Sequence, residues 1–163
     1  MHTPEKTLNY LKEHHLDDRL EESDVSFHHV EDAYKFNLKS DQVAKSLLFY
    51  DNSKANGELA AVMVVMSGDS KISTGEFKRR FGYKTSMCSY DDVVSLTGYK
   101  PGGVCPFGID NPNVKIFLDI SLKKWDIVCP ACGSEFSRIR LSPQELENSL
   151  PGTEWVDITK KEQ

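Results

Sequence analysis

Hydrophobic positions along the chain follow helical spacing in some segments and short continuous runs in others. Leucines after Thr3 predict a helix over residues 3–15. Ser73, Ser89 and Ser142 each precede an acidic residue by three positions, as in an N-terminal capping box, and they predict three further helices. Apolar runs predict strands at residues 25–28, 45–50, 59–66, 83–88, 114–119, 127–129, 138–141 and 155–158.

The order of these elements is neither a strict alternation of strands and helices nor a series of strands alone. It fits a mixed sheet with helices packed on its outside. The length of 163 residues suits one domain, residues 1–163, around a single core. We therefore expect an α/β (α+β) fold in one domain.

Composition narrows the class of protein. The formal net charge of −5 argues against a protein that binds nucleic acid non-specifically, which would need a basic surface, and we expect no DNA partner. This net charge is compatible with a protein that binds only the end of an RNA. No stretch approaches the roughly 18 apolar residues of a membrane span, and the N-terminus has no apolar signal region. We expect a cytoplasmic protein with no membrane partner.

A loop rich in glycine and proline occupies residues 98–108, with four glycines and two prolines. Such a segment cannot continue a helix or a regular strand. Its bare backbone can aim N–H groups, such as those of Gly102 and Gly103, at an oxygen that gains negative charge. The alternative is a loop that only turns a corner between two elements.

Lys45 stands at the start of an apolar run, directly before Ser46. A lysine at a strand end beside buried surface can be partly desolvated, which lowers its pKa. The alternative is an edge lysine that extends its ammonium group into water.

Three motifs occur in a fixed order along the chain. A lysine enters an apolar strand, a Gly-Gly-Val-x-Pro-Phe-Gly loop follows, and a Gly-Ser turn precedes Leu-Ser-Pro-x-x-Leu. From about Val25 to Ile158 the chain thereby resembles the YbaK/EbsC/ProX-like family, the free-standing relatives of the editing domain of bacterial prolyl-tRNA synthetases. The resemblance implies a core at about residues 25–158 and a curved mixed sheet flanked by helices. The segment from Glu31 to Leu38 looks shorter than the helix usual there.

The resemblance also implies a function. Such a protein would hydrolyse the ester between a small mischarged amino acid (Ala, Cys, Ser or Thr) and the 3′ end of a tRNA, with proline tRNA favoured. Lys45 would orient the ester, and the backbone of Gly102 and Gly103 would bind the oxyanion. Aminoacyl-tRNA is the expected partner, a synthetase is a further candidate, and no cofactor is required. The expected substrate-binding residues are Phe27, His28, Ser46, Val104, Pro106, Ala131, Cys132, Gly133 and Ser134.

Two hypotheses from other classes stay open. One is a non-catalytic module that binds an aminoacyl or nucleotide group in the same pocket. The other is a small zinc or redox protein, because Cys129-Pro-Ala-Cys132 resembles half of a zinc ribbon. A structural zinc needs four ligands, and the chain has no second Cys-x-x-Cys. Two ordinary thiols at a strand end are the simplest interpretation of this pair.

Overall fold

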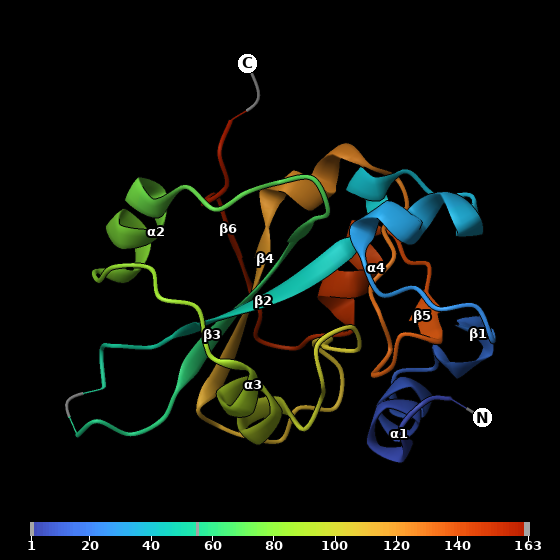
Figure 1. Ribbon diagram of the computed structural model, residues 1–163, viewed down its shortest axis with the longest axis horizontal. Coiled ribbons are helices and arrows are strands. Elements are labelled where there is room, and N and C mark those ends of the chain that lie inside the picture. Colours follow the sequence, from blue (N-terminus) through green and yellow to red (C-terminus); the bar gives the residue numbers. More distant parts are fainter. Residues whose placement is uncertain (1, 55, 162–163) are drawn as a thin grey trace.

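A four-stranded mixed sheet forms the centre of the computed structural model, which describes residues 2–54 and 56–161 (Figure 1). Its strands, in spatial order, are β2 (Ala44–Tyr50), β3 (Ala61–Ser67), β4 (Val114–Asp119) and β6 (Glu154–Val156). β2 runs antiparallel to β3, whereas β4 is parallel to both of its neighbours. A separate antiparallel pair consists of β1 (Leu20–Glu22) and β5 (Ser137–Ile139). The expected mixed sheet is therefore confirmed.

Helices surround the sheet, and three of them begin where the capping pattern predicts. The Ser73, Ser89 and Ser142 hydroxyls each accept a hydrogen bond from the backbone N–H three residues later. The α-helices are α1 (Glu5–Glu13), α2 (Thr74–Phe81), α3 (Tyr90–Thr97) and α4 (Pro143–Asn148). The three serine caps begin α2, α3 and α4. Four 3₁₀ helices connect other elements: η1 (Asp17–Arg19), η2 (Val30–Phe36), η3 (Ser40–Gln42) and η4 (Ile120–Lys124). None of the helices in the described part of the chain is long and apolar enough to cross a membrane.

Strand β3 is buried on both faces and divides the core in two. Because successive side chains of a strand point to opposite faces, Met63 and Val65 pack in the cluster that contains Leu11 of α1. Val64 lies on the other face and packs with Phe77 of α2. The apolar run at residues 59–66 is thus the central strand, as a run without alternation predicts.

Several predicted strands are wrong. Residues 25–28 form no strand; they are an extended segment in which the Phe27 N–H donates to the Glu135 oxygen at 2.7 Å. Residues 83–88 pair with the edge of β2 only through the isolated bridge at Met87. Residues 127–129 likewise make only isolated bridges. An apolar run predicts burial beside a sheet, but it does not show whether the backbone pairs over several residues or over one.

Candidate functional site

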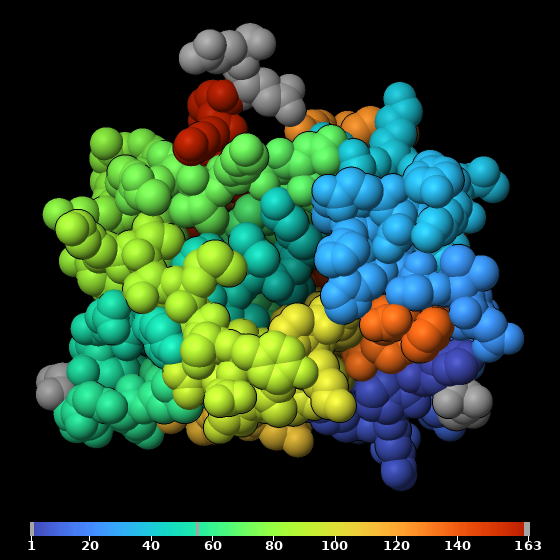
Figure 2. Space-filling model, viewed as in Figure 1, coloured from blue at the N-terminus to red at the C-terminus, as the bar shows by residue number. Residues whose placement is uncertain are grey.

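A cavity of about 410 Å³ opens beside the free edge of β2. Figure 2 shows it as a hollow at the centre of one face, between the blue segment that contains η2, the yellow glycine-rich loop and the light green segment before α3. The volume lies within the range of small-molecule sites. The lining residues come from five parts of the chain and do not include every residue of each part: residues 27–30, 43–48, 87–93, 101–104 and 129–138.

The edge of β2 is closed at its two ends and open between them. The Ala44 N–H donates to the Cys129 oxygen at 3.1 Å, and the Cys88 N–H donates to the Leu48 oxygen at 3.0 Å. Backbone groups of alternate residues in an antiparallel strand point to the same edge, so the N–H and C=O of Ser46 point there too. Within the described residues, nothing pairs with Ser46 on this edge. β2 therefore offers a free donor and a free acceptor to the cavity, which the sequence analysis did not anticipate.

Lys45 lines this cavity with its ammonium group held in place. Its Nζ donates to the backbone oxygens of Gly68 at 3.0 Å and Ser70 at 2.6 Å. Burial lowers the pKa of Lys45, and the nearby charges of Asp69 and Asp41 oppose this shift. An ammonium group has three N–H donors, and two of those of Lys45 are used by these oxygens of the described residues, so the group can donate a third hydrogen bond. Lys45 is not an edge lysine that extends freely into solvent.

The loop that holds Lys45 is itself fixed against η3. A Cβ atom at Gly68 would lie 2.0 Å from the Ser40 oxygen, so only glycine allows this approach. Asp41 accepts hydrogen bonds from the Ser67 hydroxyl at 2.7 Å and the Asp69 N–H at 3.2 Å. Burial opposes ionisation of Asp41, but hydrogen bonds from Lys124, Ser67 and Trp125 outweigh it and hold the Asp41 pKa below its usual value.

The glycine-rich loop packs tightly against two other segments. Gly102 has a φ of 98°, and a Cβ atom there would lie 2.5 Å from Nδ1 of His28. A Cβ atom at Gly103 would lie 2.6 Å from the backbone of Gly133. The glycine-rich loop and the Gly-Ser turn, far apart in the sequence, therefore lie in contact.

The loop backbone offers fewer donors than the sequence suggests. The Gly103 N–H donates to the Lys100 oxygen at 2.9 Å and so is engaged within the loop itself. Gly102 and Val104 line the cavity, and among the described residues their N–H groups have no hydrogen-bonded acceptor. The candidate oxyanion donors of this loop are thus the N–H groups of Gly102 and Val104.

The remaining expected site residues fall into two groups. Phe27, His28, Ser46 and Ala131 line the cavity together with Lys45. Four others lie outside its lining: Pro106, Cys132, Gly133 and Ser134. Pro106 borders a second cavity, and Cys132 is fully buried. Ser134 closes a turn, since its hydroxyl accepts from the Phe136 N–H at 3.0 Å.

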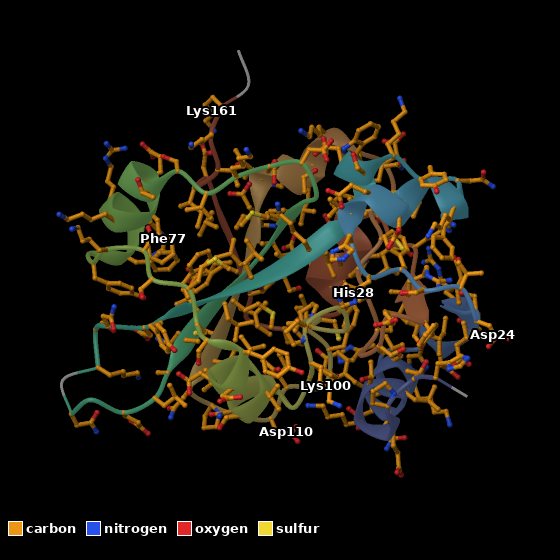
Figure 3. The ribbon with its side chains drawn as sticks, in the orientation of Figure 1. Asp24, His28, Phe77, Lys100, Asp110 and Lys161 are labelled. Carbon is orange, nitrogen blue, oxygen red and sulfur yellow. The ribbon has the colours of Figure 1, made fainter. Side chains whose placement is uncertain are left out.

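His28 is oriented at the rim by a carboxylate that the sequence analysis missed. Its Nδ1 lies 3.1 Å from Oε2 of Glu135, whose other oxygen accepts from the Ser26 hydroxyl at 2.9 Å. The hydrogen bonds from Ser26 and His28 hold the pKa of Glu135 below its usual value. Figure 3 shows His28 beside the end of β2 that begins at Ala44. The imidazole is thereby held facing the glycine-rich loop, with Nε2 left for a ligand.

Other lining residues gave no signal in the sequence. Met87 and Tyr90 are exposed apolar side chains that border the cavity, with 60% and 57% of their surfaces accessible. Arg138 also lines it but is only 3% exposed. Among the described lining residues, Lys45 is the one lysine and Arg138 is the one arginine, and none is Asp or Glu. The cavity therefore favours a ligand that carries hydrogen-bond acceptors or negative charge.

Burial makes the thiols of the cysteine pair poorly reactive. Cys129 and Cys132 are buried, and burial raises the pKa of Cys129 to about 12. Oxidants react with the thiolate form, which such a pKa makes scarce. Across residues 2–54 and 56–161, no group of three or more His, Cys, Asp or Glu side chains is placed to hold a metal ion.

Thiol labelling tests this directly. Under native conditions at pH 8 we expect at most Cys88, the one partly accessible thiol of the four, to react with a disulfide reagent, and slowly, because burial raises its pKa to about 11. All four thiols should react once the chain is unfolded in guanidinium. Rapid native labelling of two thiols, or zinc bound at one ion per chain, would instead favour the zinc or redox hypothesis.

Comparison with known proteins identifies the family to which the chain belongs. The sequence model of the family described as "Aminoacyl-tRNA editing domain" matches residues 24–148, well over half of the chain. The chain belongs to this aminoacyl-tRNA editing family. Its resemblance to the YbaK-like proteins is thereby confirmed, and the matched range contains all the candidate site residues.

Relatives and solved structures agree with this assignment. YwhH of Bacillus subtilis (strain 168), an uncharacterized protein, is 39% identical over 119 residues, which are 73% of this chain and 72% of YwhH. A structure described as a proposed trans-editing enzyme for prolyl-tRNA synthetase is 25% identical, with a TM-score of 0.81 and 96% of each chain covered. The crystal structure of the hypothetical protein APE2540 has a TM-score of 0.82 at 26% identity, covering 96% of this chain and all of that one. The editing-domain fold is thereby confirmed.

Proposed function

We propose that the protein is a trans-editing aminoacyl-tRNA deacylase. Its reaction would be hydrolysis of the ester between a small mischarged amino acid and the 3′ end of a tRNA, with proline tRNA as the favoured carrier. The observation that carries this proposal is the ammonium group of Lys45, fixed between two backbone oxygens in the wall of a cavity that no described carboxylate lines. Membership of the editing family and the likeness to a proposed prolyl-tRNA trans-editing enzyme support it.

The donors around the cavity suit the charge that develops in ester hydrolysis. Water adds to the carbonyl carbon, and the carbonyl oxygen becomes an oxyanion. The third N–H of Lys45 and the backbone N–H groups of Ser46, Gly102 and Val104 are the donors available to it. The bond to the ribose oxygen then breaks, and that oxygen takes up the proton that the attacking water has lost. The products are the free amino acid and a tRNA with a free 3′ end.

The open strand edge and the rim would orient the substrate. The free C=O of Ser46 can accept a hydrogen bond from the α-ammonium group of an aminoacyl ester. His28, held by Glu135, and the exposed Tyr90 lie on the rim, where the terminal ribose and adenine would enter. An aminoacyl ester is already activated, so orientation and oxyanion stabilisation can supply most of the catalysis.

A panel of charged tRNAs tests the proposal. Proline tRNA carrying Ala, Cys, Ser, Thr or Pro would be incubated with the wild-type protein, and release of the amino acid would be timed. We expect rapid release of at least one small non-cognate residue, with the Pro ester left intact. If no ester is cleaved but amide-linked analogues bind, the protein is the non-catalytic binding module of the second hypothesis.

The dependence of kcat/KM on pH tests the role of the Lys45 ammonium group. Its ammonium form is the donor, and burial lowers its pKa from the ordinary 10.5. The ammonium group therefore loses its proton at a lower pH than an ordinary lysine does. After subtraction of spontaneous hydrolysis, we expect kcat/KM to decline on the alkaline side from a pH below 10.5. A rate that stays constant up to pH 10.5 would contradict a role for this ammonium group.

A further inference from the structure

Arg138 is a buried cation in the wall of the cavity. Only 3% of its surface is exposed, although guanidinium groups are rarely buried without a partner. Its Nη2 donates to the Ser23 hydroxyl at 2.8 Å, and its Cζ lies 4.1 Å from the ring centroid of Phe36. Neither contact supplies a negative charge. The guanidinium group is therefore held in position, and none of the described carboxylates forms an ion pair with it.

The acid nearest to Arg138 in the strand pairing is engaged elsewhere. Glu21 lies directly opposite Arg138 in the β1–β5 pair, but its carboxylate accepts from Nε of Arg140 at 2.8 Å. The carboxylate of Glu21 therefore faces two positive charges, those of Arg138 and Arg140. One carboxylate cannot neutralise both, so a net positive charge remains beside the cavity. A ligand atom with negative or partial negative charge would balance it.

Two residues that line the cavity each carry a buried side-chain polar atom without a hydrogen-bond partner in the described structure. The atoms are Nε of Arg138 and Oγ of Ser46. Buried polar atoms are almost always paired, because an unpaired one has lost its hydrogen bonds to water without a replacement, which costs free energy. A ligand that paired with both atoms would remove this cost upon binding.

We propose that Arg138 and Ser46 form a polar subsite at the inner end of the cavity, which recognises a substrate side chain carrying a hydrogen-bond acceptor. This inference rests on the proposed function. Its inner position follows from burial, since Met87 and Tyr90 at the mouth are mostly exposed and Arg138 is not. Short hydroxyl, amide or carboxylate side chains can accept from Nε of Arg138, and an alkyl side chain of equal size cannot. A site built for hydrogen bonds rejects analogues that lack the polar group.

Isosteric side chains on one tRNA test the subsite with the wild-type protein alone. A single tRNA would be charged chemically or by a ribozyme with Thr or Val, and with Asn or Leu, so that the tRNA body and side-chain size stay matched. We expect hydrolysis of the Thr ester at least 10-fold faster than the Val ester, and of the Asn ester at least 10-fold faster than the Leu ester. Equal rates, or faster release of Val and Leu, would overturn the subsite.

Two hydroxyl deletions provide a matched pair of variants. Ser46→Ala removes the unpartnered Oγ in the cavity, and Thr85→Ala removes a buried unpartnered Oγ1 outside its lining. We expect the Thr-to-Val rate ratio to fall at least threefold in Ser46→Ala and to stay unchanged in Thr85→Ala. Arg138→Met should abolish the ratio, with its folding checked by circular dichroism. An unchanged ratio in Ser46→Ala and in folded Arg138→Met would exclude these groups from side-chain recognition.

A binding measurement separates failure of the subsite from failure of the proposed function. Adenosine carrying Thr or Val through an amide at the 3′ position cannot be hydrolysed, so calorimetry reads recognition alone. If no ester is cleaved but the Thr analogue binds at least 10-fold more tightly than the Val analogue, the subsite stands and the catalytic proposal fails. If both analogues bind equally, the subsite fails whatever the catalytic result.

Discussion

Lys45→Ala is expected to slow deacylation by about 100- to 1,000-fold, the cost usually measured when one donor to an oxyanion is removed. The ammonium group is the one charged donor of the cavity wall whose position two backbone oxygens define. Its loss leaves those oxygens of Gly68 and Ser70 without this donor, so we expect a modest loss of stability of about 1 kcal/mol. The single-turnover rate, measured well below the unfolding temperature, isolates the catalytic effect.

Lys71→Ala is the matched control. Lys71 is an exposed lysine near Lys45, and its positive charge acts to lower the Lys45 pKa, but it does not line the cavity. Removing it deletes one charge from the same loop region without touching the site. We expect a rate within threefold of the wild type. Similar losses in both variants would point to a general electrostatic effect instead of a donor at Lys45.

Gly103→Ala should damage both stability and activity. The backbone at Gly103 has no positive φ, so alanine is conformationally acceptable there, but its Cβ atom would lie 2.6 Å from the backbone of Gly133. Gly133 is itself closely packed, because a Cβ atom there would lie 2.7 Å from Oγ1 of Thr7 and 2.8 Å from Pro4. Such overpacking costs about 1–3 kcal/mol, and separation of the two loops would displace Gly102 and Val104. Denaturant unfolding and the deacylation rate measure the two effects.

Gly75→Ala provides the comparison for this substitution. Gly75 lies in the first turn of α2, and a Cβ atom there would meet nothing within 4 Å. Alanine also favours the helix, so we expect a gain of up to about 0.5–1 kcal/mol and no change in rate. If Gly103→Ala were as stable and as active as Gly75→Ala, the close packing of the two loops would not be required for the site.

Local signals in the sequence predicted the starts of three helices well. A serine followed three residues later by an acidic residue specifies a helix start through bonds within one turn, and Ser73, Ser89 and Ser142 all make them. Strand pairing depends on partners that are distant in the sequence. Residues 25–28 and 83–88 have the apolar pattern of strands, but the structure assigns no strand to either segment. The curved mixed sheet itself followed from the family resemblance, because the order of elements fits more than one arrangement.

Sequence motifs pointed to part of the cavity lining, and tertiary contacts build the rest. Lys45 and Gly102, which the motifs single out, are among the lining residues, and their roles in catalysis stay a prediction. Glu135 and Arg138 gave no signal, since their roles arise from His28 and Phe36, more than 100 residues away. Four expected residues lie outside the lining, although they belong to the same loop motifs as lining residues: Pro106, Cys132, Gly133 and Ser134. A motif names a stretch of chain, but it does not show which of its side chains face the cavity.

The role of Lys45 in deacylation can be tested most directly without choosing a substrate in advance. Total tRNA charged with all amino acids would be treated with wild-type protein and with Lys45→Ala, and the released amino acids would be identified by mass spectrometry. We expect the wild type to release one or a few small amino acids selectively above the buffer rate, and Lys45→Ala to release them at least about 100-fold more slowly. Release of no amino acid beyond spontaneous hydrolysis, or equal release by the variant, would contradict an editing deacylase built on Lys45.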